Sequence, residues 1–266
     1  MINIFKLRKR YLFLWTTVIL IAGSVIFYKP IYKLFYPDYT YRYRLTVEID
    51  TPDGVKSGSS VIEVYTIQWP KWSQHLFAGN YSQSFAKGEA VFVDLGNGKN
   101  IVALLTHGHY AESTSIKRLA PRSFFKDMRA SSKSPELSEK LSEMTGEVRE
   151  LTGSLTPTIA TFDNPNDPES LNIVYAVEIY NKKRKNYITL DTMKSKLGKG
   201  FKFKSAKIQL TNDPVTNTLG NHLPWSDNAA KVYKAWKKIV SDPPKNKRFH
   251  FLNVFRSDEL LQYKKF

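Results

Sequence analysis

A hydrophobic run near the N-terminus constrains this chain more than any other feature. Residues 11–28 contain no charged side chain over 18 positions. An α-helix rises about 1.5 Å per residue, so the run would span roughly 27 Å, close to the thickness of a bilayer core. Tyr11 and Trp15 stand near one end and Tyr28 at the other, where aromatic residues suit membrane interfaces. The run predicts a single transmembrane helix with these three residues as its anchor points.

The charges around the run predict its orientation. Residues 1–10 contain four basic residues and no acid, whereas Lys29 and Lys33 follow the run. This bias favours a cytoplasmic N-terminus, hence a single-pass protein of the cell inner membrane with a periplasmic C-terminal region. A cleaved signal peptide is the main alternative, because residues 22–24 (Ala-Gly-Ser) resemble a cleavage site. The apolar run continues past Ser24, which favours retention of the segment. A buried core helix is a third reading, disfavoured by the basic flank.

The rest of the chain divides into four parts on this interpretation. Residues 1–10 form a basic cytoplasmic tail, 11–28 the transmembrane helix, 29–41 an aromatic and basic stalk, and 42–266 a soluble region. The aromatic residues of the stalk have a second interpretation, in which they begin the first strand and pack inward. The composition, 42% hydrophobic and 24% charged, is that of a globular protein. Cysteine is absent, which excludes disulfides, thiolate zinc sites, a cysteine nucleophile and a lipoprotein anchor.

The formal net charge of +16 is divided between the first 44 residues and the rest of the chain. Residues 1–44 contribute +7 and the remainder +9. A basic soluble region favours anionic partners such as lipid headgroups. The alternative is a basic surface that is merely solvated. Nucleic acid fits poorly as a partner if this region lies outside the cytoplasm.

Alternating apolar and polar residues predict strands through most of the soluble region. Strands are expected at 42–50 and 61–67 around a turn at 51–54 (Thr-Pro-Asp-Gly), and Gly58 predicts a bulge or a close backbone approach. A second hairpin is expected at 89–95 and 101–106, its second strand central in a sheet. Ser134 and Pro135 predict the start of a helix that runs to about Leu151. Further expected elements are strands at 157–162, 171–180, 201–210 and 248–256 and helices at 191–197 and 229–240. The predicted fold class is α+β, a mainly antiparallel sheet with a few helices behind one transmembrane helix.

Three stretches together resemble a family of uncharacterised bacterial envelope proteins with an N-terminal hydrophobic segment. They are residues 42–64, residues 88–96 (Gly-Glu-Ala-Val-Phe-Val-Asp-Leu-Gly), and residues 211–216 through 223–225 (Leu-Pro-Trp). The resemblance implies an envelope location and a shared fold. It implies no activity and no catalytic residues.

Two histidines form the closest candidate for a metal site. His107 and His109 are two residues apart, so on an extended segment both imidazoles point the same way and could reach one metal ion. A third ligand is required, for which the candidates are Asp94, His75 and Glu112. This pair would serve a metal-dependent hydrolase, and the alternative is that both histidines are structural. No cofactor is expected.

A basic stretch is the candidate for binding an anionic surface. Tyr187 and Phe201 are interleaved with it, and the alternative is a solvated face. The candidate residues are Lys182, Lys183, Arg184, Lys185, Lys202 and Lys204.

The function favoured by these observations is a membrane-anchored, extracytoplasmic binding or interaction protein that is not an enzyme. Its expected partners are the lipid bilayer and another envelope protein, with the 51–54 turn and residues 58–60 as the expected contact surface. The two alternatives are the metal-dependent hydrolase and an envelope protein that binds anionic lipid.

Overall fold

The computed structural model describes residues 15–18, 30–70, 72, 82–108, 116–125, 135–181, 186–239 and 254–258. Strands dominate these residues and helices are few, which confirms the predicted α+β class. No helix in these ranges combines the length and the apolar character that crossing a bilayer demands. Most of residues 11–28, with Tyr11 and Tyr28, lies outside the described residues.

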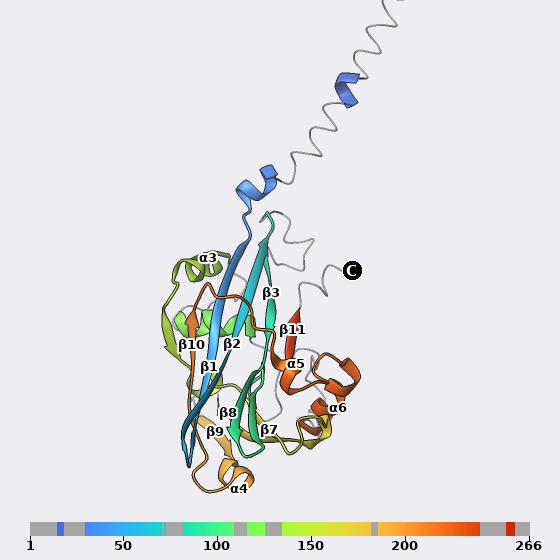
Figure 1. Cartoon of the computed structure of the whole chain (residues 1–266). Coiled ribbons are helices and arrows are strands. Elements are labelled where there is room, and N and C mark those ends of the chain that lie inside the picture. The colour runs from blue at the N-terminus through green and yellow to red at the C-terminus, as the bar shows by residue number, and fades with distance from the viewer. Residues whose placement is uncertain are drawn as a thin grey trace, which may run out of the picture.

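The first sheet contains the long N-terminal hairpin, and all its strand pairs are antiparallel. In the described part of the chain its strand order is β11-β3-β2-β1-β10-β6. The strands are β1 (Tyr39–Thr51), β2 (Gly54–Gln68), β3 (Ser82–Glu89), β6 (Val148–Glu150), β10 (Lys202–Leu210) and β11 (Arg256–Asp258). β1 pairs with β2 along its whole length without a register shift, which confirms the predicted hairpin and its turn (Figure 1). Since β1 begins at Tyr39, the last residues of the predicted stalk belong to the sheet.

The second sheet is also antiparallel, in the order β4-β5-β7-β8-β9 over the described residues. Its strands are β4 (Val91–Gly96), β5 (Lys99–Ala103), β7 (Ile159–Phe162), β8 (Leu171–Asn181) and β9 (Asn186–Asp191). The predicted hairpin at 89–106 is β4 and β5, closed by a turn in which Gly96, Asn97 and Gly98 all have positive φ. β5 lies between β4 and β7, so its central position is confirmed.

One hydrophobic core joins the two sheets. The inward face of β1 presents Tyr43, Leu45, Val47 and Ile49, each at most 2% exposed. These side chains belong to the same cluster as the buried residues of β4, β5 and β7. The two sheets therefore pack face to face across a shared interior.

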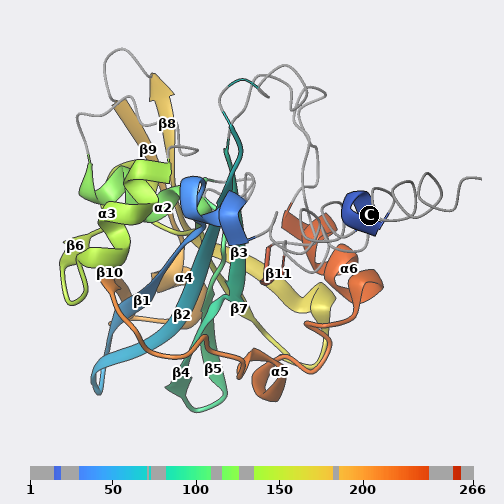
Figure 2. The same cartoon turned by 90° about the horizontal axis from the view of Figure 1, so that it is seen from above.

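Short helices cover the margins of the sheets. They are α2 (Ile116–Phe124), α3 (Pro135–Glu143), α4 (Met193–Leu197), α5 (Leu219–His222) and α6 (Ala229–Ile239), with 3-10 turns at Gly153–Leu155 and Pro168–Ser170. α2 and α3 lie together on one side of the molecule, and α5 and α6 lie on the other (Figure 2). Buried Tyr43 ties β1 to α2, because its hydroxyl donates to the Ile116 carbonyl at 2.7 Å.

One predicted helix was extended too far. The helix expected to run to Leu151 ends at Glu143, because Gly146 adopts a φ of +92° and the chain then pairs with β10 as β6. Val148 fitted the helical spacing but is an exposed strand residue. Of the last strand, expected at 248–256, residues 248–253 lie outside the described residues, Val254 and Phe255 form a turn, and Arg256 begins β11.

Gly58 is a close backbone approach and not a bulge. A Cβ at Gly58 would lie 2.4 Å from the Phe92 carbonyl oxygen of β4, whereas the β1–β2 register is unbroken there. Ser60 is buried on the same strand. Gly58 and Ser60 therefore serve packing between the two sheets, while Ser59 and the turn at Pro52 to Gly54 are exposed.

Candidate functional site

Between β3 and β4 the chain passes from the first sheet to the second within a single residue. β3 belongs to the first sheet and β4 to the second, and only Ala90 separates them. The Ala90 amide donates to the Phe255 carbonyl at 2.8 Å, and the Leu105 amide donates to the Val254 carbonyl at 3.0 Å. The segment around β11 thus closes this corner of the fold by bonding both sheets. Glu89, the last residue of β3, stands at that corner.

The Glu89 carboxylate is buried and anchors the loop before α5. Its side chain is 3% exposed. Oε1 accepts hydrogen bonds from the amides of Thr218 at 2.6 Å and Leu219 at 3.0 Å, and from the Thr218 hydroxyl at 3.2 Å. One oxygen therefore has three donors, whereas Oε2 accepts no hydrogen bond.

Arg256 lies between two carboxylates at this corner. It is paired with Glu89 in the β3–β11 ladder, and its Nη2 lies 3.3 Å from Glu89 Oε2. Its Nη1 donates to Asp227 Oδ1 at 2.5 Å. The Arg256 side chain is 23% exposed and that of Asp227 is 67% exposed, so the ion-pair cluster runs from the interior to the surface.

A cavity of about 580 Å³ opens beside this cluster. It is lined by the end of β3, by β11, by residues 215–217 and by the start of α6. Within the described part of the chain, three residues that line it each have a buried polar atom with no hydrogen-bond partner: Oε2 of Glu89, Nε of Arg256 and Oγ of Ser226. Buried polar atoms are nearly always paired, and leaving one unpaired costs about 1–3 kcal/mol.

These three atoms, of which Glu89 Oε2 is in ionic contact with Arg256, define the chemistry that the cavity can accommodate. A carboxylate oxygen requires a donor, a guanidinium N–H requires an acceptor, and a hydroxyl can take either role. The ionisable side chains lining the cavity are Lys87, Glu89, Asp227, Arg256 and Asp258, which sum to a formal charge of −1 in a chain of +16. The cavity suits a polar group that both donates and accepts, such as an amide or a hydroxyl, and does not favour an anion.

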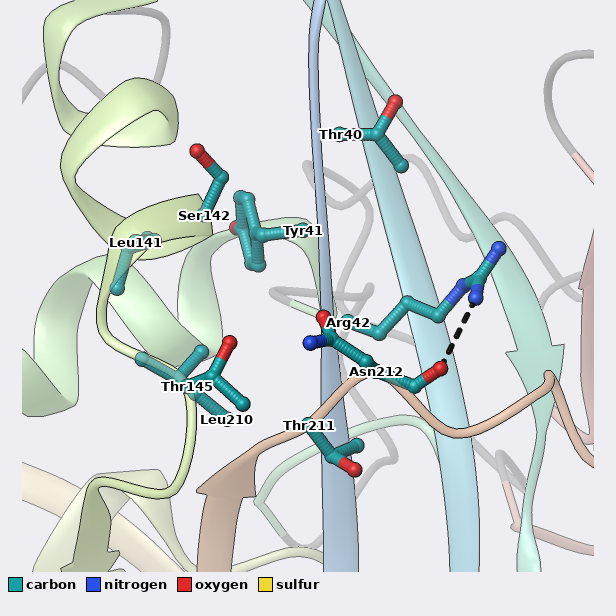
Figure 3. A pocket seen from close by; sticks show the side chains of 9 residues that line it. All are labelled: Thr40, Tyr41, Arg42, Leu141, Ser142, Thr145, Leu210, Thr211 and Asn212. Atoms are coloured by element: carbon teal, nitrogen blue, oxygen red, sulfur yellow. Dashed lines mark hydrogen bonds between the residues drawn. The ribbon is translucent and has the colours of Figure 1, made fainter.

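A smaller cavity, of about 230 Å³, lies between β1, the end of α3 and the end of β10. Its polar lining consists mainly of hydroxyl and amide groups. Figure 3 shows the Tyr41 ring directed toward α3, while Arg42 points to the other side of β1 and donates to the Asn212 carbonyl at 3.4 Å. Arg42 also pairs with Glu63 at 2.7 Å. No described residue lining this cavity has a buried polar atom without a partner, so it is the weaker candidate for ligand binding.

His107 is half-buried beside core residues of β1 and α2, and its predicted partner His109 lies outside the described residues. The His107 Nδ1 lies 3.0 Å from the Thr156 carbonyl. Burial lowers the pKa of His107, with a smaller contribution from Arg122 in the same direction, against the hydrogen bond to Thr156. Across the described ranges, no three His, Asp or Glu side chains gather as metal ligands would. The metal-site prediction stays a prediction.

The predicted basic face is described only in part. Lys182, Lys183, Arg184 and Lys185 lie outside the described residues. Lys202 and Lys204 lie on β10 with exposed side chains, and the Lys204 ammonium is 3.9 Å from Asp50. Anionic-surface binding by these residues is neither supported nor contradicted by this arrangement.

The corner residues Glu89, Arg256 and Asp227 were not predicted as a site. The sequence contained one signal for this site, which is that Glu89 stands at the start of an apolar strand. A charged residue at an inward position of a strand needs a partner of opposite charge or hydrogen-bond donors. The partners of Glu89 come from distant parts of the chain, which periodicity does not reveal. Comparisons with protein-family models, with curated proteins and with solved structures found no match.

Proposed function

We propose that this chain is a membrane-anchored, extracytoplasmic binding module that holds a polar segment of another envelope protein in the corner cavity. The uncharged run at 11–28 supports the anchor, and the cytoplasmic N-terminus follows from the basic flank. Arg256 Nε and Ser226 Oγ, which have no hydrogen-bond partner, support the binding role, together with Glu89 Oε2, which accepts no hydrogen bond and lies 3.3 Å from Arg256 Nη2. A peptide group supplies one N–H and one C=O, which are a donor for Glu89 Oε2 and an acceptor for Arg256 Nε.

The ion-pair cluster suits binding better than catalysis. Glu89 Oε1 is saturated by three donors, and Arg256 contacts two carboxylates, so these side chains are held in place by the fold. Such rigid, paired charges give orientation and selectivity to a complex. Asp227, at 67% exposure, is the member of the cluster that an incoming segment meets first.

Photo-crosslinking in native membranes tests the binding role. A photoreactive amino acid at Asn217, an exposed residue lining the cavity, is expected to give a discrete protein adduct. The same probe at Val55, which is 49% exposed at the distant β1–β2 turn, is the matched control. Asp227→Asn should weaken the adduct at Asn217. Equal labelling from both positions would contradict a binding site at the corner.

A separate experiment tests the anchor. The full chain is expected to stay with membranes after an alkaline wash, whereas a chain that begins at residue 29 should be released. Protease added outside the inner membrane should digest the region after residue 41 and spare the N-terminal tail. Release of the full chain by the wash would rule out a transmembrane anchor.

A further inference from the structure

An exposed apolar surface lies where the soluble domain meets the proposed anchor. Residues 30–35 are helical, and three of their side chains are strongly exposed: Ile31 at 55%, Leu34 at 77% and Phe35 at 70%. Positions i, i+3 and i+4 lie on one face of a helix, so these side chains form a single apolar stripe. Exposed apolar residues grouped in this way mark an interaction surface more often than scattered ones do.

The helix is fixed to the domain by its other side. The Tyr32 hydroxyl donates to the Gln68 carbonyl at 3.2 Å, and the Gln68 amide donates to the Pro37 carbonyl at 2.7 Å. Lys33 pairs with Asp38 at 2.5 Å, and Asp38 also accepts from the Tyr65 hydroxyl. These contacts hold the helix on the open end of the β1–β2 hairpin, where it directly precedes β1 (Figure 1).

Trp72 adds a fourth apolar side chain at this end of the molecule. It is 71% exposed and follows Gln68 by four residues. Four residues reach at most about 14 Å, so Trp72 stays near the helix that Gln68 holds. Helix 30–35 and Trp72, which are separate in the sequence, thus both present exposed apolar side chains at this end of the molecule.

We propose that helix 30–35 and Trp72 form a membrane-seated face that fixes the domain upright on the bilayer surface. This inference rests on the proposed anchor. The uncharged run ends at Tyr28, two residues before the helix, so the face lies at the level where a spanning helix leaves the hydrocarbon. In the sequence, Lys29 and Lys33 stand close to Phe35, and exposed Phe35 and Trp72 add aromatic side chains, a composition that matches a membrane interface.

The position of the far turn follows from this orientation. β1 has 13 residues and rises about 3.3 Å per residue, so the turn at its end lies roughly 40 Å from the membrane-seated face. Val55 at that turn is 49% exposed and serves as the reference for a water-facing position.

Depth-dependent fluorescence quenching tests the proposal. The chain has no cysteine, so one introduced cysteine carries the only label. Leu34→Cys, Trp72→Cys and Val55→Cys versions of the full chain, labelled with an environment-sensitive dye, are reconstituted in vesicles of zwitterionic and anionic lipid. Labels at 34 and 72 should be quenched several-fold more by a nitroxide lipid than the label at 55. The label at 55 should instead be quenched by aqueous iodide.

The outcomes separate this proposal from the anchor itself. If the chain floats with the vesicles but labels 34 and 72 behave like label 55, the anchor stands and the membrane-seated face is wrong. Protection of label 34 from both lipid and iodide means a protein covers the face, which also overturns the proposal. A chain that fails to float removes the anchor and this proposal together.

A paired substitution provides the second test. Leu34→Ser with Phe35→Ser should leave flotation unchanged and reduce lipid quenching of a label at residue 72 to the level seen at residue 55. Val148→Ser is the matched control, because Val148 is 45% exposed on β6 and lies away from this face. Unchanged quenching at residue 72 in the paired variant would show that the helix does not seat the domain.

Discussion

Individual buried polar residues decide how the corner of this fold is held together. Glu89 is almost fully buried, yet four atoms of other residues contact its carboxylate: two amide nitrogens, a hydroxyl and a guanidinium nitrogen. Those residues belong to the end of the loop before α5, to the first position of α5 and to β11. One side chain therefore links the sheet crossing, that loop and the last described strand.

Glu89→Gln should destabilise the protein by about 2–3 kcal/mol. The change leaves Arg256 facing a neutral amide, and breaking a buried ion pair costs about 3–5 kcal/mol, which is reduced here because Arg256 is 23% exposed. Urea unfolding followed by tryptophan fluorescence measures the loss. Glu147→Gln is the control, since its bridge to Arg149 is exposed on both sides and should contribute less than about 1 kcal/mol. If both substitutions lowered the free energy of unfolding equally, burial of the Glu89–Arg256 pair would not be the cause of the loss.

His107 should make stability depend on pH in the acidic range. Burial lowers its native pKa below the unfolded value of 6.5, so the native state favours the neutral ring. The contribution of His107 to the free energy of unfolding is complete at pH values above 6.5, the pKa of the unfolded state. It decreases as the pH falls below 6.5, by at most about 1.4 kcal/mol per pH unit for one proton. His107→Gln should flatten this part of the profile in unfolding titrations at several pH values. A profile unchanged by that substitution would assign the dependence to other groups.

At the scale of elements, local patterning explains what the sequence predicted and what it did not. The alternation in β1, β2 and β10 and the turn signals at 51–54 and 96–98 are local, so these elements were predicted. Helix α3 was extended too far because Val148 continues its apolar spacing, and only pairing with β10 shows that residues 148–150 are a strand. β3 and β9 were not predicted, since the residues of β3 are mostly polar and small and its pairing with β2 is a tertiary feature. The corner site depends on such long-range pairing throughout.

Gly58→Ala should weaken the packing of β2 against β4. The new Cβ would lie 2.4 Å from the Phe92 carbonyl oxygen, which is backbone and has little freedom to move. Overpacking of this kind costs about 1–3 kcal/mol. The midpoint of thermal unfolding should fall, whereas Ser59→Ala, at the exposed neighbouring position, should leave it nearly unchanged. A Gly58→Ala protein as stable as the parent would show that the sheets can separate at this point.

At the scale of the whole molecule, the shared core predicts one cooperative unit. Buried residues of both sheets belong to one cluster, and the chain passes between the two sheets repeatedly, once through Ala90 alone. Unfolding in urea should therefore give coincident transitions by far-UV circular dichroism and by tryptophan fluorescence, to which buried Trp225 contributes. Two separated transitions would mean that the sheets fold independently.

The place of β1 has a mechanical consequence. β1 is hydrogen-bonded to β2 on one side and to β10 on the other, and it follows directly from the segment that joins the proposed anchor. A force applied through that segment pulls along the strand axis. Because ladder bonds run across the strands, the force shears many of them at once and does not peel them one by one. We therefore expect the domain to resist unfolding by tension between the membrane and a bound partner. A domain attached to its anchor through a strand at a sheet edge would resist such tension far less.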